Sequence, residues 1–230
     1  MITLLHGEYI EASRSELRRL IERAKSTSEI RQLDGGSLDE ASLAQAIESL
    51  SLFGTPTLVV IERLFAKLGR QQKRIASIAA FIQQSVKDND IVLWEDKELS
   101  AGTVKQLGPG ANVRLFKLPM LIFHFLDNLR PGNAKNSLVI YQQLIATEPA
   151  ELVFSMLAGR VRQLIQLQDN VTPARLAPWQ ATRLTLQAKS FTMDKLLAMY
   201  KKLHDIEVSI KTGVSPISMA LKTQQFLTEV

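Results

Sequence analysis

Two short apolar runs, residues 57–61 (TLVVI) and 90–94 (DIVLW), are the segments that most restrict how this chain folds. Neither run alternates regularly between apolar and polar positions, and β-branched residues are prominent in both. Continuous runs of this length are typical of strands that are buried on both faces of a parallel sheet. We therefore expect a sheet that has helices on both of its sides.

Three further segments fit strands of the same sheet, at residues 2–5, 29–33 and 112–117. Helical patterns separate the strand candidates, and Ser13 and Ser37 stand where they could cap the first two helices. Other helical patterns cover residues 75–86 and 98–107. Strands that alternate with helices predict a three-layer α/β domain with a parallel sheet, over residues 1–118.

After Leu118 and Pro119 the hydrophobic pattern changes and only helical periodicity follows. The candidate helices cover residues 120–129, 134–146, 149–168, 178–188, 192–212 and 215–229. Pro149 and Pro216 are expected in the first turns of their helices, where the missing N–H group has no intrahelical partner. Residues 119–230 are therefore predicted to form an all-α domain.

Composition excludes several classes of site. The chain of 230 residues has no cysteine, which rules out disulfides and thiolate metal ligands, and its three histidines lack a zinc-binding spacing. No apolar run is long enough for a membrane span, and the first residues do not resemble a signal peptide. We expect a cytoplasmic protein. The formal net charge of +5 permits contact with nucleic acid or an acidic partner.

Gly7 follows the first predicted strand, where a phosphate-binding loop of the pattern G-x-x-x-x-G-K-[ST] would begin. Counted from Gly7, the second glycine falls on Ala12, the lysine on Ser13 and the hydroxyl residue on Arg14. Glu62 and Arg63, after the strand at 57–61, only weakly resemble an acidic magnesium-binding pair. We interpret this half as a degenerate nucleotide-binding domain that holds no cofactor or metal and is not an enzyme.

Other residues leave alternatives open. Glu95, Asp96 and Glu98 form a carboxylate cluster at a strand end, which would suit a metal- or nucleotide-dependent enzyme, although acidic side chains are also common at helix starts. Basic residues recur at three places, where they could contact DNA phosphates or simply lie in solvent; they are Arg70, Lys73 and Arg74, then Arg160 and Arg162, then Lys201, Lys202 and Lys211.

Several segments, taken in order, resemble the delta subunit of the bacterial DNA polymerase III clamp loader. They are ITLLHGEYIEASRSELRRLIERA, EIRQLDGGSLDEASLAQAIESLSLFGTPTLVVIERL, DNDIVLWEDKELSAGTVKQL, the segment from IFHFLDNL to RQLIQLQD, and SFTMDKLLAMYKKLHDIEVSIKTG. The resemblance covers nearly the whole chain. It implies a degenerate AAA+-type domain followed by a helical collar-like oligomerisation domain.

The resemblance also implies a function. Leu52 and Phe53 match the helix end with which the family contacts the sliding clamp, so the chain would open that ring for loading onto primed DNA, with other loader subunits as partners and neighbouring subunits hydrolysing ATP. Arg70, Lys73 and Arg74 remain candidate DNA contacts. One departure is that NVRLFKLP passes directly to MLIFHFLDNL, where the family has a small lid domain. A stand-alone clamp-binding regulator and a DNA-binding module remain alternatives.

Overall fold

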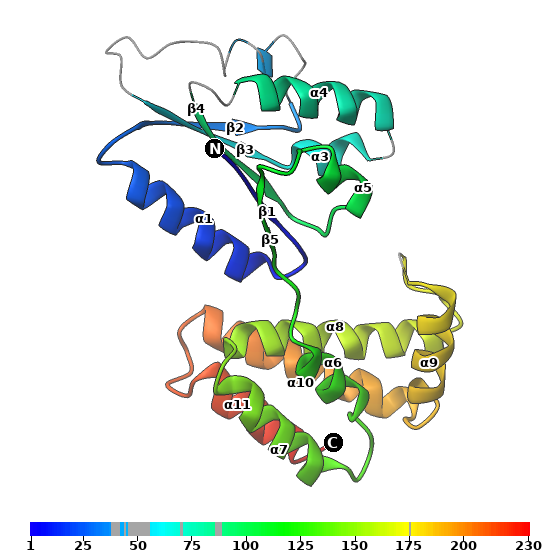
Figure 1. Cartoon of the computed structure of the whole chain (residues 1–230). Helices are drawn as coiled ribbons and strands as arrows, with labels where there is room; N and C mark the ends of the chain where they lie inside the picture. The colour runs from blue at the N-terminus through cyan, green and yellow to red at the C-terminus, as the bar shows by residue number, and fades with distance from the viewer. Residues whose placement is uncertain (38–41, 44, 46–55, 70, 86–88, 175) are drawn as a thin grey trace. The chain divides into compact units, whose positions relative to one another are not determined.

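The computed structural model describes the chain apart from residues 38–41, 44, 46–55, 70, 86–88 and 175. It contains two compact units, Met1–Leu118 and Pro119–Val230. The first unit is shown in blue to green in Figure 1, and its elements are β1 (Ile2–His6), α1 (Ile10–Ala24), β2 (Glu29–Asp34), β3 (Thr57–Glu62), α3 (Leu64–Leu68), α4 (Gln72–Ser85), β4 (Asn89–Glu95), α5 (Ala101–Lys105) and β5 (Asn112–Leu115).

The five described strands form one sheet in the order β2-β3-β4-β1-β5, and every neighbouring pair is parallel. In the centre, β1 pairs with β4 so that Leu4 lies opposite Leu93 and His6 opposite Glu95. The prediction of an α/β fold with a parallel sheet is thus confirmed. The two continuous apolar runs are β3 and β4, which, like β1, have a neighbouring strand on both sides.

Side chains alternate between the two faces of the sheet. Leu58 and Val60 pack with Trp94 and Leu17 on the face that α1 covers. On the opposite face lies a larger cluster that includes α3, α4 and the loop after β4; its members include Val59, Ile61, Ile75, Ile82, Leu93 and Leu99. Figure 1 shows α1 on one side of the sheet and α3, α4 and α5 on the other. Both faces of β3 and β4 are therefore dry, which explains their uninterrupted apolar sequence.

The second unit is helical throughout its described part. Its elements are α6 (Met120–Asp127), α7 (Ala134–Ile145), α8 (Ala150–Gln168), α9 (Pro178–Ala188), α10 (Met193–Lys211) and α11 (Met219–Leu227). α8 is central, because α6, α7, α9, α10 and α11 all pack against it. Its core includes Phe125 and Tyr141, whose ring centroids are 5.8 Å apart, and the Tyr141 hydroxyl donates to the Ala220 carbonyl. The predicted helical second half is confirmed.

Some predicted helix ends are wrong. α1 begins at Ile10, so Ser13 lies inside the helix, where its hydroxyl donates to the Ile10 carbonyl. α11 begins at Met219 with Ser218 as its cap, which leaves Pro216 outside the helix. Pro149 is the cap of α8 and not a first-turn residue. At α11 two serines, Ser215 and Ser218, could cap the helix, and the structure uses Ser218, whose hydroxyl accepts the Leu221 N–H.

Candidate functional site

The crevice at the carboxyl ends of β1 and β4 is where a parallel sheet of this order would bind a ligand. β1 leads through α1 towards the edge strand β2, whereas β4 leads through α5 to β5 on the other side of β1. The two neighbouring strands thus send their connections in opposite directions, and ligands of open α/β sheets bind at such a switch point. This is also the position of Gly7, where the sequence suggested a vestigial phosphate-binding loop.

Hydrogen bonds within the protein close this crevice. Only Gly7, Glu8 and Tyr9 connect β1 to α1. The Gly7 N–H donates to the Lys97 carbonyl in the loop after β4, at 3.2 Å, and the Tyr9 N–H donates to the Phe116 carbonyl, at 3.0 Å. A phosphate-binding loop needs free N–H groups that converge on the ligand. Here the two N–H groups are already bonded to the protein.

Gly7 has a steric role in the same closure. Its φ is +135°, and a Cβ atom at this position would lie 2.1 Å from the Phe116 carbonyl oxygen. The segment after β5 therefore passes so close to the β1–α1 connection that only glycine fits. The glycine that suggested a phosphate site thus permits close packing of the protein against itself.

His6 ties the loop after β4 to the end of β1. Its Nδ1 accepts the Leu99 N–H at 3.1 Å, so the ring is neutral in this arrangement. Burial lowers the pKa of His6, and the nearby Glu98 carboxylate opposes that effect in part. Because the side chain is buried and its accepting nitrogen is occupied, we assign His6 to the closure of the crevice.

Ser13 and Arg14, which occupy the lysine and hydroxyl positions of the phosphate-loop pattern, both contact Trp94. The Trp94 indole N–H donates to the Ser13 hydroxyl at 3.1 Å, and the Arg14 guanidinium lies 3.5 Å from the centre of the indole ring. Arg14 also pairs with Glu62 at 2.7 Å. A guanidinium over an indole face is a favourable cation–π arrangement. The place of a phosphate-binding lysine is therefore taken by contacts that join α1 to β3 and β4.

Glu95 does not form a site with Asp96 and Glu98, as the enzyme alternative would require. Its side chain is fully buried and accepts the backbone N–H groups of Phe65 and Ala66, at 2.7 and 2.8 Å, at the start of α3. Burial raises the pKa of Glu95 from 4.5 to about 7, and these two N–H groups oppose the rise. Asp96 and Glu98 are exposed. Glu95 is thus a buried cap of α3.

Three of the predicted site residues, Leu52, Phe53 and Arg70, lie outside the described residues. Lys73 and Arg74 are exposed in the first turn of α4, and Arg74 donates to the Gln71 side chain. Nothing in their surroundings distinguishes a DNA contact from a solvated surface. The roles of these five residues remain predictions.

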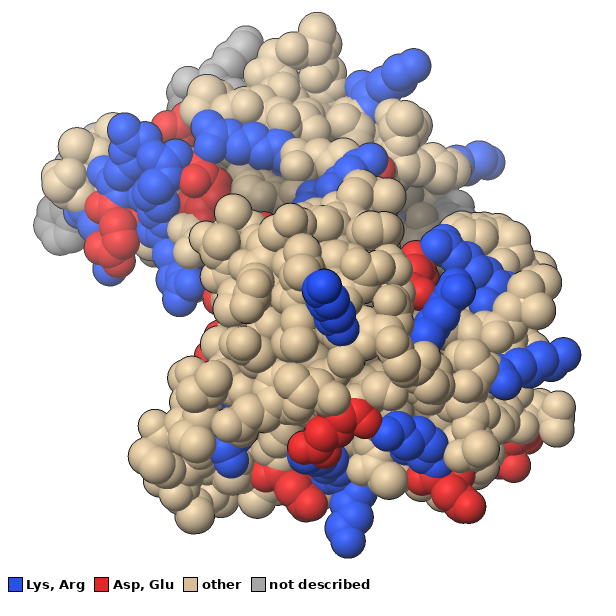
Figure 2. All heavy atoms as spheres, turned by 90° about the horizontal axis from the view of Figure 1, so that it is seen from below, with Lys and Arg blue, Asp and Glu red and all other residues tan. Residues whose placement is uncertain are grey.

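The other basic residues differ from one another. Arg160 is buried, which corrects the expectation that it could contact phosphates. Lys202 pairs with Glu229 and Lys211 with Glu207. On the face that Figure 2 shows, acidic side chains lie among the basic ones, so that face presents no continuous basic surface of the kind that a nucleic-acid backbone favours.

Within the described residues, no three histidine, aspartate or glutamate side chains lie close enough to hold a metal ion together. None of the helices that the structure describes has the length and apolar character needed to cross a membrane.

Comparison with known proteins assigns no function to this chain. No family model matches the chain, and no curated protein matches it by sequence. Among solved structures, it is similar to the Bacillus subtilis DNA clamp loader delta protein (YqeN), with 12% sequence identity and a TM-score of 0.46, over 99% of this chain and 94% of that one. A similarity of this size transfers no function from that protein to this chain.

Proposed function

We propose that this protein is a delta-like subunit of a clamp loader, which binds and opens a DNA polymerase sliding clamp and does not hydrolyse ATP itself. In this role the α/β unit carries the clamp-binding element and the helical unit associates with other loader subunits. The proposal starts from the ordered sequence segments that resemble the delta family, from the first strand to the last helices.

The observation that carries the proposal is the closed switch point of the parallel sheet. The position of a nucleotide in such a sheet is filled by the bond from Gly7 to Lys97 and by the packing of Arg14 on Trp94. A domain that keeps this architecture while its own residues fill the ligand crevice is suited to acting through its surface. Binding of a protein partner is such an activity, and turnover of a nucleotide is not.

Leu52 and Phe53 are the proposed clamp contacts. They follow a predicted helix and precede Gly54 and Pro56, so they would stand at the end of that helix. Two large apolar side chains at a helix end can fill a pocket on a partner, and a few such residues usually supply most of the binding free energy.

The test is binding of the full chain to the sliding clamp of its own organism, measured by calorimetry for the wild type and for the Leu52→Ala/Phe53→Ala double variant. Two anchors worth about 2 kcal/mol each would weaken the Kd roughly 1000-fold when both are truncated. A matched control is the Val139→Ala/Val171→Ala variant, which truncates two exposed apolar residues of the helical unit.

Binding that the control keeps and the folded double variant loses would support the proposal. Equal binding by the double variant would refute the assignment of Leu52 and Phe53, and no binding by the wild type would refute the clamp-loader role. Titration of the Trp179→Phe variant with ATP and magnesium, followed by the fluorescence of Trp94, tests the other half of the proposal. Because Arg14 already covers that ring, a saturable response with a micromolar Kd would contradict the closed crevice.

A further inference from the structure

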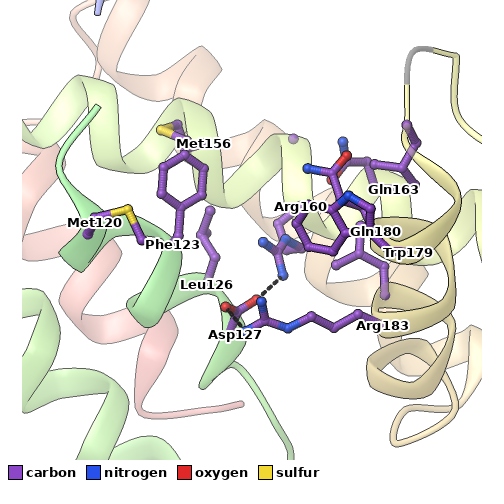
Figure 3. A pocket seen from close by; sticks show the side chains of 13 residues that line it. Met120, Phe123, Leu126, Asp127, Met156, Arg160, Gln163, Trp179, Gln180 and Arg183 are labelled. Atoms are coloured by element: carbon purple, nitrogen blue, oxygen red, sulfur yellow. Dashed lines mark hydrogen bonds and ion pairs between the residues drawn. The ribbon is translucent and has the colours of Figure 1, made fainter. Parts of the chain in front are cut away.

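The helical unit contains a groove of about 510 Å³ that the proposed function does not use. It runs over α8, with α6 along one side and α9 along the other, and Figure 3 looks into it. Its apolar lining includes Met120, Phe123, Met156, Leu176, Trp179 and Leu184. A concave site of this size, mostly apolar and with few polar groups, is typical of places that bind another molecule.

Each of the three helices contributes a stripe about two turns long. On α8 the stripe consists of Met156, Gly159, Arg160 and Gln163, which are spaced by three or four residues and so share one face. Two turns correspond to roughly 11 Å along a helix axis. The groove is therefore long enough for two turns of a further helix lying over α8.

Gly159 leaves the floor of the groove open. A Cβ atom at this position would meet no other atom within 4 Å, so the space above the backbone is free. Glycine in the middle of a helix lowers helix stability, and its presence here needs another reason. Close approach of another backbone to α8 is such a reason, because small residues allow helices to pack tightly.

Charged side chains mark the middle of the groove. Arg160 is 9% exposed and donates to Asp127 at 2.9 Å and to Gln187 at 2.8 Å. Arg183 pairs with the other oxygen of Asp127, and its own side chain remains 59% exposed. The described residues that line the groove thus include two guanidinium groups and one carboxylate, which leaves a net positive charge.

The ends of the groove are apolar and open to solvent. Figure 3 shows Met120, Phe123 and Met156 on one side of the charged group and Trp179 on the other. Met120 is 78% exposed and Trp179 66% exposed. Methionine, tryptophan and arginine are the residues that protein interfaces favour, and methionine adapts to partners of different shape.

We propose that this groove binds an amphipathic helix of another protein, with bulky apolar side chains of that helix between Phe123 and Trp179 and one of its carboxylates against Arg183. The net positive charge of the groove favours an acidic residue on the partner. A nucleic-acid backbone does not fit, since one excess positive charge among apolar side chains cannot neutralise a row of phosphates. The proposal refines the proposed function by giving the helical unit a partner-binding surface. It rests on the proposed function only for the identity of the partner protein.

The first experiment places a photo-crosslinking phenylalanine derivative at Gln163 of the full chain, in the organism that carries it, with the same group at Val139 as the control. Val139 is exposed on α7, away from the groove. We expect the group at position 163 to crosslink to a helical segment of another protein that carries apolar residues three and four apart and an Asp or Glu beside them.

The second experiment uses a synthetic peptide of the crosslinked segment and the full chain with Trp94→Phe. Trp179 is then the one remaining tryptophan, and burial by the peptide should shift its emission to the blue. Gly159→Leu should fill the floor and weaken binding at least tenfold, and Gly159→Ala, which adds only a Cβ, should weaken it by a smaller factor. Arg183→Glu should weaken binding by a similar factor, and Lys135→Glu, a charge reversal on α7, should not. Changing the carboxylate of the peptide to lysine should restore binding to Arg183→Glu.

The proposal is overturned if the crosslinks at 163 do not exceed those at 139, or if they join residues 1–118 of the same chain or a second copy of it. It is also overturned if the peptide binds Gly159→Leu as tightly as the wild type. Measurement of clamp binding by the same variants separates the two proposals. Gly159→Leu should still bind the clamp, and Leu52→Ala/Phe53→Ala should still crosslink at position 163.

Discussion

The buried carboxyl of Glu95 makes the stability of the α/β unit depend on pH in a direction opposite to that of most carboxylates. Burial raises its pKa from 4.5 to about 7 in the folded protein. Below pH 4.5 the group is protonated in both the folded and the unfolded state. Between pH 4.5 and 7 it ionises in the unfolded state alone, so the free energy of unfolding falls as the pH rises, and above pH 7 the loss is complete.

The size of this effect follows from the two pKa values. At about 1.4 kcal/mol for each pH unit, the difference between 4.5 and about 7 corresponds to a loss of about 3 kcal/mol of unfolding free energy, most of it between pH 4.5 and 7. The variant Glu95→Gln cannot ionise and should not show this loss. The Phe65 and Ala66 N–H groups compete for the single oxygen of the glutamine, so the variant should be less stable than the wild type at pH 5.

The assay is urea unfolding at pH 5, 6, 7 and 8 in a Trp179→Phe background, in which Trp94 reports on the α/β unit alone. His6 acts in the opposite direction, because its lowered pKa makes the folded state lose stability as the pH falls through that value. The difference between wild type and Glu95→Gln removes this contribution. Glu11→Gln, at an exposed position on α1 away from the charge partners of both groups, is the matched control. Identical pH slopes for wild type and Glu95→Gln would refute a buried carboxyl with a raised pKa.

Two other substitutions test the closure of the crevice and the charged group of the groove. Gly7→Ala should lower the unfolding free energy of the α/β unit by at least about 1–3 kcal/mol, because a φ of +135° is unfavourable for alanine and its Cβ would meet the Phe116 carbonyl. An unchanged midpoint of urea unfolding, followed by Trp94 fluorescence, would contradict this. Arg160→Met should destabilise the helical unit by about 1–3 kcal/mol, because the buried Gln187 oxygen loses its donor. Urea unfolding followed by Trp179 fluorescence, in a Trp94→Phe background, measures this loss, and Arg162→Met is the control.

The strands of the sheet could be predicted because their evidence is local. The apolar runs of β3 and β4 mark strands with two dry faces, and a change of period separates the strand-rich half from the helical half. Helix ends were less predictable. Ser13 fits a capping position, yet its hydroxyl is used inside α1 by Trp94, a residue 81 positions away in sequence. Local patterns cannot reveal which of two possible starts a distant side chain stabilises.

For the switch point, the sequence predicted only that the residues of a phosphate-binding loop are missing. That Arg14 would lie on Trp94 and pair with Glu62 depends on the order of the strands, which brings α1, β3 and β4 together. Arg160 illustrates the same limit, since its neighbour Arg162 has similar sequence surroundings and only the packing of α8 on α9 buries one of the two. The proposed roles of Leu52, Phe53 and Arg70 are based on the sequence alone.

The two proposals are linked by the closed switch point of the α/β unit. A nucleotide bound at the switch point would act on the loops after β1 and β4, and changes in those loops are one way in which such a domain can alter its surface. In this chain Gly7, His6 and Tyr9 bond those loops to each other and to the segment after β5. These bonds argue against a switch driven by a nucleotide at this position. In the proposed role a change of state would come from a partner, and the groove proposed to receive a helix is one route for it.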